Sequence, residues 1–360
     1  MGGMSSEEED LDLEAQLNSL NKPPVKTIQT SWGDLYDCIE FHKQPAFDHP
    51  LLKKYKHSMR EEMIVSKKSD TMPMSGVDGC PKGTVPIRRT SKEDLIRAKS
   101  LSVSSPLSSS NPRPGVEYRA GVTYLKMGEA FNGARGIVSV WNPKVNQDQF
   151  SSAEMALKSG PQEQTSAIKF GWTVNPQLYG DNMTRTFAYW TGDGGHKTGC
   201  YNTLCKGFVQ VHQTYTPVMF FQNTSQVRKP PVAFTVEISR EPGTGKWWLM
   251  IEKDIKIGYW AKDLFPLFRP GVEYIYWGGR VKSGKDGVSP AMTSGINLNR
   301  FQETTGFFDA LKLKDKNDHN LEPVRKHLED TIDCPKFYGA KYWADNNIVL
   351  FSGRGGGTCV

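Results

Sequence analysis

Two basic residues with glycine neighbours are the clearest candidates for chemistry in this sequence. In AIKFGWTV (167–174), side-chain alternation places the large apolar residues on one face of a predicted strand, opposite to Lys169, Gly171 and Thr173. In EYIYWGGRV (273–281), the same alternation gives a second polar face, which carries Tyr274, Tyr276, Gly278 and Arg280. Because a glycine on a sheet face leaves a hollow for another backbone, we expect both cations to border a groove of peptide width.

The chemistry available to this pair of cations is limited. Arginine stays protonated at any accessible pH, so Arg280 cannot act as a general base. Lys169 can do so only if burial and the neighbouring cation lower the pKa of its amine. Two adjacent cations therefore favour binding of an acidic ligand over hydrolysis. The plainer interpretation, a lysine that faces water on a half-exposed sheet, remains open for Lys169.

The elements that must position these residues are predicted to be strands. From residue 116 to residue 360, short alternating runs recur between Gly, Pro, Asn and Asp, among them YRAGVTYL, GARGIVSVWNP, TRTFAYWTG, VAFTVEISR and KWWLMIE. Only SSAEMALKSG (151–160) and AKDLFPLF (261–268) have helical character. We predict a mainly β fold, an antiparallel β-sandwich over 116–360, with a core that includes Trp247, Trp248, Trp260 and Trp277.

The first part of the chain is organised differently. Residues 1–20 are acidic and are predicted to be disordered, with at most a short helix over 11–20. Residues 21–99 are predicted to form a small mixed α/β domain, with a hairpin in VKTIQTSWGDLYDCIEF and helices in HPLLKKYKHSMR and in SKEDLIRAKS, which Ser91 opens. Residues 100–115 are rich in Ser and Pro and almost uncharged, which indicates an exposed linker and a candidate processing site.

Composition argues against several classes of protein. The net charge of +6 is spread along the chain without a basic block, so we expect no nucleic-acid partner. No apolar run reaches the roughly 20 residues that cross a bilayer, so we expect no membrane span. His42, His49 and His57 are loosely spaced and no cysteines have CxxC spacing, so we expect no metal and no cofactor.

Six cysteines and two sequons indicate the secretory pathway. Among the pairings that six cysteines allow, sequence proximity favours Cys38–Cys80, Cys200–Cys205 and Cys334–Cys359. The sequons place potential glycans on Asn182 and Asn223. The acidic N-terminus lacks the apolar segment of a signal peptide, so we expect a secreted or extracellular protein, in the cell wall or the vacuole, whose signal is missing through truncation or an erroneous start. The alternative is a cytosolic protein with six reduced cysteines.

Several long irregular runs resemble the neprosin family of plant proteins. They are GWTVNPQLYGDNMTRTFAYWTGDGGHKTGCYNTLCKGFVQV, GTGKWWL, IGYWAKDLF and YWGGRV. LNKPPVKTIQTSWGDLYDCIEFHKQPAFDHPLL and CPKGTVPIRRTSKEDLIRAK look like the activation-peptide domain that precedes the sandwich in that family. The resemblance covers residues 18–360 and implies a secreted zymogen of a glutamic endopeptidase that cuts after proline.

The resemblance also implies where the family's catalytic glutamates would lie. One carboxylate takes a proton from water while a second, protonated carboxyl hydrogen-bonds the oxyanion, and the two groups split their pKa values because they are close. The two positions, before the Gly-Trp of the GW.V.P.LYGDN motif and after the Gly-Gly of the WGG motif, hold Lys169 and Arg280 in this chain.

These replacements predict a non-catalytic homologue. We expect a monomer that keeps its own propeptide domain as a partner and that binds an acidic peptide or an acidic polysaccharide in the groove. The alternative is an active glutamic-type prolyl endopeptidase zymogen in which another acidic pair serves.

Overall fold

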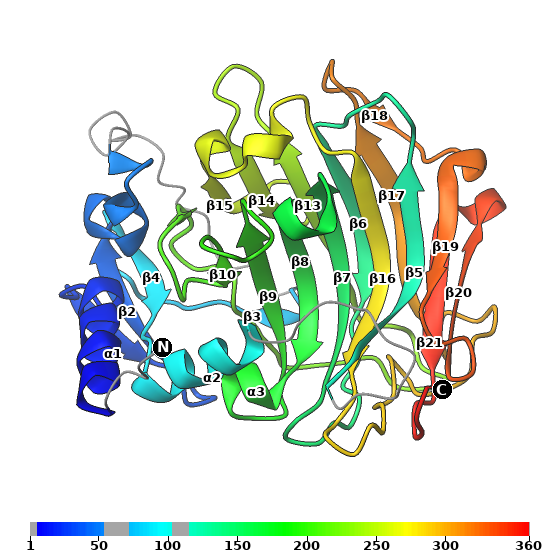
Figure 1. The fold of residues 1–360 in the computed structure, drawn as a ribbon, viewed down its shortest axis with the longest axis horizontal. Helices are drawn as coiled ribbons and strands as arrows, with labels where there is room; N and C mark the ends of the chain where they lie inside the picture. The colour runs from blue at the N-terminus through cyan, green and yellow to red at the C-terminus, as the bar shows by residue number, and fades with distance from the viewer. Residues whose placement is uncertain (1–5, 54–71, 103–114, 360) are drawn as a thin grey trace.

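Two large antiparallel sheets form a sandwich, and a smaller unit made by the N-terminal residues lies against one end of it (Figure 1). The computed structural model describes residues 6–53, 72–102 and 115–359. The predicted mainly β fold with a small mixed α/β region before it is therefore confirmed. Part of the predicted 49–60 helix and most of the predicted 100–115 linker lie outside the described residues.

The first sheet has nine strands, with the order β19-β5-β16-β7-β8-β9-β12-β3 and β10 paired to β9. Its strands are β3 (Met74–Ser75), β5 (Glu117–Leu125), β7 (Phe150–Ser159), β8 (Ser166–Val174), β9 (Thr184–Thr191), β10 (Cys200–Tyr201), β12 (Phe220–Phe221), β16 (Tyr274–Lys282) and β19 (Leu328–Ile332).

The second sheet also has nine strands, with the order β11-β15-β14-β13-β6-β17-β21-β20 and β18 paired to β17. Its strands are β6 (Gly133–Ser139), β11 (Phe208–Gln210), β13 (Ala233–Arg240), β14 (Trp247–Ile251), β15 (Ile255–Trp260), β17 (Gly306–Lys314), β18 (Asn320–Leu321), β20 (Tyr338–Trp343) and β21 (Ile348–Gly353).

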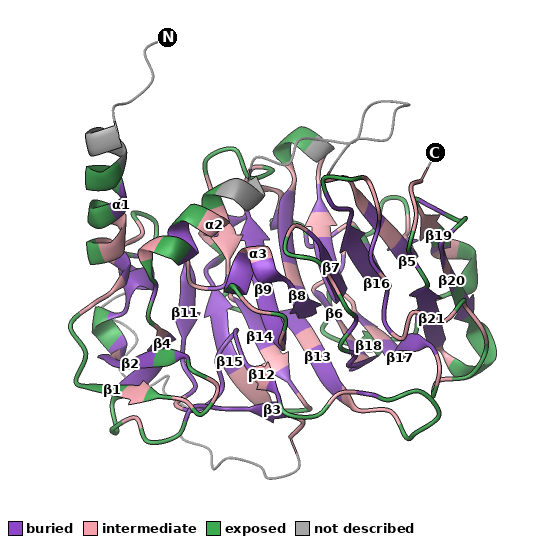
Figure 2. Cartoon of the chain, turned by 90° about the horizontal axis from the view of Figure 1, so that it is seen from below, coloured by how far each residue is buried: buried purple, intermediate pink, exposed green. Residues whose placement is uncertain are grey.

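The core lies between the two sheets and is rich in aromatic residues. Buried positions dominate the strands of both sheets, whereas exposed positions lie on the helices and turns (Figure 2). The four tryptophans that the sequence assigned to the core, Trp247, Trp248, Trp260 and Trp277, are all buried. Alternation places Phe170 and Trp172 of β8 in this core, as predicted, and so leaves Lys169 on the other face of the first sheet.

The N-terminal unit combines a three-stranded sheet with two helices. The sheet has the order β1-β2-β4, with β1 (Lys26–Gln29), β2 (Leu35–Glu40) and β4 (Thr84–Arg88). β1 and β2 form the predicted hairpin. The predicted helix after Ser91 is α2 (Lys92–Ser102), and the Ser91 hydroxyl accepts a hydrogen bond from the backbone N–H of Asp94.

One prediction for this unit is wrong. Residues 6–20 are not disordered: they form α1 (Ser6–Leu20). The acidic composition of the segment hides a short apolar stripe in which Leu13 and Leu20 pack against Leu95 of α2. Tertiary packing of that stripe, which a composition argument does not register, stabilises the helix.

The remaining helical elements are short. The segment AKDLFPLF forms two 3₁₀ turns, η5 (Lys262–Leu264) and η6 (Pro266–Phe268), rather than one α-helix, because Pro266 has no backbone N–H to continue it. The others are α3 (Pro176–Tyr179), η1 (Phe41–Lys43), η2 (Pro45–Asp48), η4 (Gln162–Gln164), η7 (Arg325–His327) and η8 (Ala344–Asn346). None of the helices in the described part of the chain is long and apolar enough to cross a membrane.

Three disulfides join the cysteines in the pairing that sequence proximity favours. They are Cys38–Cys80 within the N-terminal unit, Cys200–Cys205 beside β10, and Cys334–Cys359, which links the segment after β19 to the C-terminal segment.

Candidate functional site

Lys169 and Arg280 lie on the same face of the first sheet, but they are not neighbours. β7 runs between β8 and β16 and pairs with both of them. Lys169 is opposite Ala156 of β7, and Arg280 is opposite Ser152. Midway between these positions, Glu154 of β7 is opposite Gly171 on one side and Gly278 on the other. The strand between the two cations thus contributes a carboxylate.

The sequence prediction missed Glu154 because it assigned SSAEMALKSG to a helix. The structure shows that this segment is part of β7, a strand in the middle of the first sheet. Ala, Glu, Met and Leu favour helices locally, but burial on both sides of a central strand overrides that preference. The available signal was alternation: Ala153, Met155 and Leu157 point into the core, and Glu154 points to the other face.

Glu154 forms an ion pair with each cation. Its Oε2 lies 2.9 Å from Nη2 of Arg280, and its Oε1 lies 3.7 Å from Nζ of Lys169. The side chain of Glu154 is only 2% exposed, and that of Lys169 is 13% exposed. A second carboxylate, Glu117 of β5, lies 2.9 Å from Nη1 of Arg280 and accepts a hydrogen bond from it. A buried charge persists only when it is paired, and Arg280 is paired twice. We call the face that carries these residues the Glu154 face.

The charges of the Glu154 face shift one another's ionisation. Burial by itself would raise the pKa of Glu154, but the positive charges of Arg280, Lys169 and Lys158 outweigh it and hold that pKa below its ordinary value. Burial and the charge of Arg280 lower the pKa of Lys169. Burial by itself would lower the pKa of Arg280, but the negative charges of Glu154 and Glu117 outweigh it and raise the pKa of the guanidinium well above its ordinary value. Glu154 is therefore held as a carboxylate.

Lys158, four residues after Glu154, is a further cation on this face. It lies opposite Tyr274 of β16 and Ala167 of β8. Burial, followed by the charge of Lys169, lowers the pKa of Lys158 to about 7. Among the described residues, no carboxylate lies within ion-pair distance of its amine. Its charge therefore changes near neutral pH without a paired carboxylate.

The predicted groove residues are close-packed around Glu154. A Cβ on Gly171 would lie 1.9 Å from the carbonyl oxygen of Ala153, so the glycine is required by the approach of β7. A Cβ on Gly278 would lie 2.6 Å from the hydroxyl oxygen of Tyr276, and that hydroxyl donates a hydrogen bond to the carbonyl of Gly279. The hydroxyl end of the buried Tyr276 thus occupies the space above Gly278, so the hollow predicted at this glycine is filled.

Two further groove residues differ in exposure. Tyr274 is 38% exposed at the start of β16, and Thr173 is buried with its hydroxyl directed to the carbonyl of Ser151 at 3.3 Å. Beside them, the ring of Tyr189 on β9 lies 5.3 Å from the amine of Lys169, within the range of a cation–π contact. Of the five predicted groove residues, Tyr274 offers the accessible surface.

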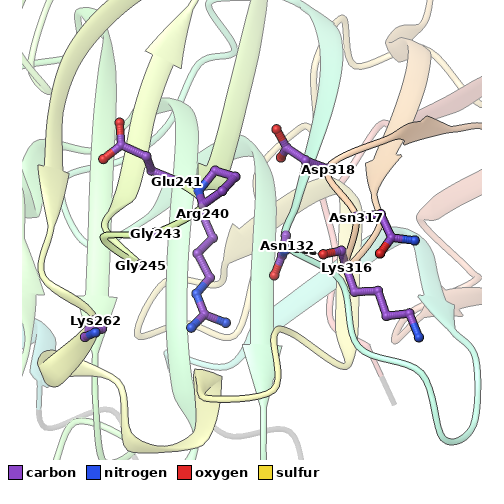
Figure 3. Close-up of a pocket in the computed structure, with 10 residues that line it drawn as sticks. Asn132, Arg240, Glu241, Gly243, Gly245, Lys262, Lys316, Asn317 and Asp318 are labelled. Atoms are coloured by element: carbon purple, nitrogen blue, oxygen red, sulfur yellow. Dashed lines mark hydrogen bonds between the residues drawn. The ribbon is translucent and has the colours of Figure 1, made fainter.

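Two cavities in the described part of the chain lie away from the Glu154 face. The larger, of about 440 Å³, is formed by turns at the ends of β13 and β17, and Figure 3 shows Arg240, Glu241 and Lys316 among its lining residues. The smaller, of about 10 Å³, lies between the N-terminal unit and the sandwich. Neither is lined by a residue of the Glu154 face.

The predicted histidines and sequons are placed as follows. His42 lies 3.4 Å from Glu40, His49 packs edge-on against Trp190, and His57 is outside the described residues. Among the described residues, no group of three or more His, Cys, Asp or Glu side chains could hold a metal ion. Asn182 and Asn223 are both exposed.

Comparison with known proteins gives two family matches. The family model described as neprosin matches residues 147–354, more than half of the chain, and the model described as neprosin activation peptide matches residues 27–116.

The similarity to solved structures is weak in both sequence identity and TM-score. A crystal structure of Scytalido-glutamic peptidase with a peptide-based transition-state analogue is 8% identical over 66% of this chain and 99% of that chain, with a TM-score of 0.38. SCP-B, a member of the Eqolisin family of peptidases in complex with the tripeptide Ala-Ile-His, is 7% identical over the same shares, with a TM-score of 0.33. The CBM40 module of the Ruminococcus gnavus IT-sialidase is 12% identical over 48% of this chain and 91% of that chain, with a TM-score of 0.24.

Proposed function

The chain belongs to the neprosin family, and from that premise we propose that it is a non-catalytic member that binds an acidic ligand on its Glu154 face. The observation that carries the proposal is the position of Glu154 between Lys169 and Arg280. Those two cations occupy the positions that the family resemblance assigns to a pair of glutamates.

The two-carboxyl mechanism requires groups that this face does not supply. One carboxyl must be protonated to hydrogen-bond the oxyanion, and the other must be ionised to take a proton from water. Glu154 is held ionised, because its pKa is lowered by its cationic neighbours. Glu117, the other carboxylate on this face near Arg280, is bound to the guanidinium. Glu154 is therefore not the protonated carboxyl that this mechanism requires.

The charge balance of the face supports an anionic ligand. Five cations, Lys158, Lys169, Arg280, Lys282 and Arg119, lie on this face; Arg119 is paired with Asp333, and Arg280 is compensated by both Glu117 and Glu154. The less compensated charge lies at Lys158, at Lys282, whose amine bonds the amide oxygen of Gln177, and, through its longer contact with Glu154, at Lys169. A carboxylate of an acidic peptide or an acidic glycan would pair with these amines beside the exposed ring of Tyr274.

A competing function is a glutamic-type prolyl endopeptidase that uses Glu117 and Glu154, because both carboxylates converge on Arg280. One assay separates the two functions. The purified full chain is incubated at acidic pH with a proline-containing peptide, before and after a cut in the 103–114 segment. We expect no cleavage; cleavage after proline that Glu154→Gln abolishes would overturn the non-catalytic proposal.

A binding measurement tests the ligand. We expect the protein to bind an oligogalacturonide or a Glu-rich peptide at low salt, and to bind a neutral oligosaccharide of the same length more weakly. Equal affinity for the acidic and the neutral probe would refute the assignment of an acidic ligand.

We also propose that the protein is extracellular. Three disulfides support an oxidising compartment, and the exposed sequons Asn182 and Asn223 are accessible for glycosylation. A mass shift on treatment of the secreted protein with a glycan-removing amidase is the expected result, and an unshifted mass would remove the glycosylation assignment.

A further inference from the structure

We propose that residues 6–102 are a permanent part of the folded protein, so that a cut in the segment 103–114 yields a two-chain assembly and not a free sandwich. The proposal concerns the surface that joins the N-terminal unit to the sandwich, and it does not depend on what the Glu154 face binds. Four features of that surface carry it.

The first feature is a shared hydrophobic core. Ile39, Phe41, Phe47, Leu52 and Val85 of the N-terminal unit belong to the same buried cluster as the aromatic residues between the two sheets. All five are at most 6% exposed. Contacts between independent units are usually smaller and more polar than a core. Removal of the unit would therefore expose apolar surface at one end of the sandwich.

The second feature is that the unit closes one edge of each sheet. β3 pairs with β12 and forms the last strand of the first sheet. At the edge of the second sheet, the side chain of Gln44 makes two hydrogen bonds with the backbone of Gln210 on β11. Its amide nitrogen donates to the Gln210 carbonyl at 3.0 Å, and its amide oxygen accepts from the Gln210 N–H at 2.8 Å. Uncovered edge strands pair with other chains, so both edges need this cover.

The third feature is a buried charge contact across the surface. Asp34 of the N-terminal unit forms an ion pair with Arg185 of β9, a residue that is 1% exposed. Arg185 also pairs with Asp181 at 2.8 Å, and Asp34 pairs with Arg88 at 3.1 Å. Without the unit, Arg185 would lose its buried counterion. The hydroxyl of Tyr36 adds a buried hydrogen bond to the carbonyl of Val218, at 2.8 Å.

The fourth feature is the tightness of the fit. The cavity described between Arg88, Asp94, Tyr179 and Val218 has a volume of about 10 Å³. That volume is about the space one water molecule requires. At this place the two surfaces therefore leave no more than about the space of one water molecule between them.

The test uses the full chain with a specific protease site placed within 103–114. After complete cutting of the folded protein, we expect both fragments to elute together in gel filtration at neutral pH and at pH 4, with an unchanged near-UV spectrum. The shared core, the pairing of β3 with β12 and the contacts of Gln44 do not titrate, so we expect them to hold the fragments together in mild acid even without the ion pair between Asp34 and Arg185. A sandwich fragment that elutes alone and remains folded would overturn the proposal.

A matched pair of variants tests the assigned surface. Gln44→Met removes the two hydrogen bonds to the backbone of Gln210 and keeps the side-chain volume, whereas Gln16→Met alters a glutamine of α1 whose amide donates to Asp12 within the same helix. In the cut protein diluted to nanomolar concentration, we expect a several-fold faster loss of the N-terminal fragment from Gln44→Met than from Gln16→Met. Equal rates would count against this surface.

Discussion

Arg280 and Glu154 form an ion pair in the middle of the first sheet, with 2.9 Å between Nη2 and Oε2 and both side chains at most 8% exposed. The cation lies at a position that the family resemblance assigns to a glutamate, and the anion lies on the neighbouring strand. The face thus carries opposite charges that bind each other, and this relationship leads to four predictions.

Removal of the anion should destabilise the fold. Glu154→Gln leaves Arg280 and Lys169 buried without their shared counterion, and we expect a loss of about 3 kcal/mol in the free energy of unfolding. Urea denaturation at pH 7 measures it. Glu322→Gln is the control, because Glu322 belongs to an exposed pair with Lys312 and its removal should have no measurable effect. Equal effects of the two variants would show that Glu154 is not paired as described.

The stabilisation by Glu154 should depend on pH with a definite sign. The folded pKa of Glu154 is lowered, so the unfolded state binds the proton more readily. The contribution is complete above the unfolded pKa of about 4.3 and is lost as the pH falls through the folded pKa. In a Lys158→Met background, which removes the amine that titrates near pH 7, the difference in unfolding free energy caused by Glu154→Gln should be constant from pH 7 to about pH 5.5 and shrink toward pH 3. A difference that grows on acidification would contradict a lowered pKa.

Binding of an acidic ligand should weaken as the amine of Lys158 loses its proton. With a pKa of about 7, Lys158 is mostly charged at pH 6 and mostly neutral at pH 8. We expect the affinity for an oligogalacturonide to fall up to about tenfold between these two values. Calorimetric titration measures it. Lys158→Met should remove the pH dependence, and Lys144→Met, at a position outside the Glu154 face, should keep it. An unchanged profile in Lys158→Met would exclude Lys158 from the site.

Restoration of glutamates at the two family positions requires a third change. In Lys169→Glu plus Arg280→Glu, Glu154 would have two new carboxylates as neighbours and no cation, which repels like charges in a buried place. Addition of Glu154→Gln should recover about 3 kcal/mol of the lost stability at pH 7. Thermal unfolding of the double and the triple variant measures the difference.

The same triple variant tests whether the Glu154 face can hydrolyse a peptide once the two family glutamates are restored. Cleavage after proline at acidic pH by the triple variant, but not by wild type, would show that the charge replacements alone account for the inactive face. Stability that is equal in the double and triple variants would contradict the central position of Glu154.

Part of this site could be predicted from local sequence and part could not. Alternation in 167–174 and 273–281 correctly placed Lys169 and Arg280 opposite the apolar face of their own strands, because the period of two is a property of each strand by itself. The disulfide partners also followed from proximity in the chain. Composition failed for 6–20, where a three-leucine contact between α1 and α2 decides the outcome.

The sequence by itself determined the strands that carry Lys169 and Arg280, the apolar side of each, and the presence of cations where the family resemblance places acids; it assigned the segment of β7 to a helix. Only the tertiary structure decided that β7 lies between β8 and β16 and brings Glu154 to Arg280. Glu154 is 15 residues from Lys169 and 126 from Arg280 in the chain. The order of strands in a sheet results from pairing between distant segments, and no local pattern of side chains specifies it.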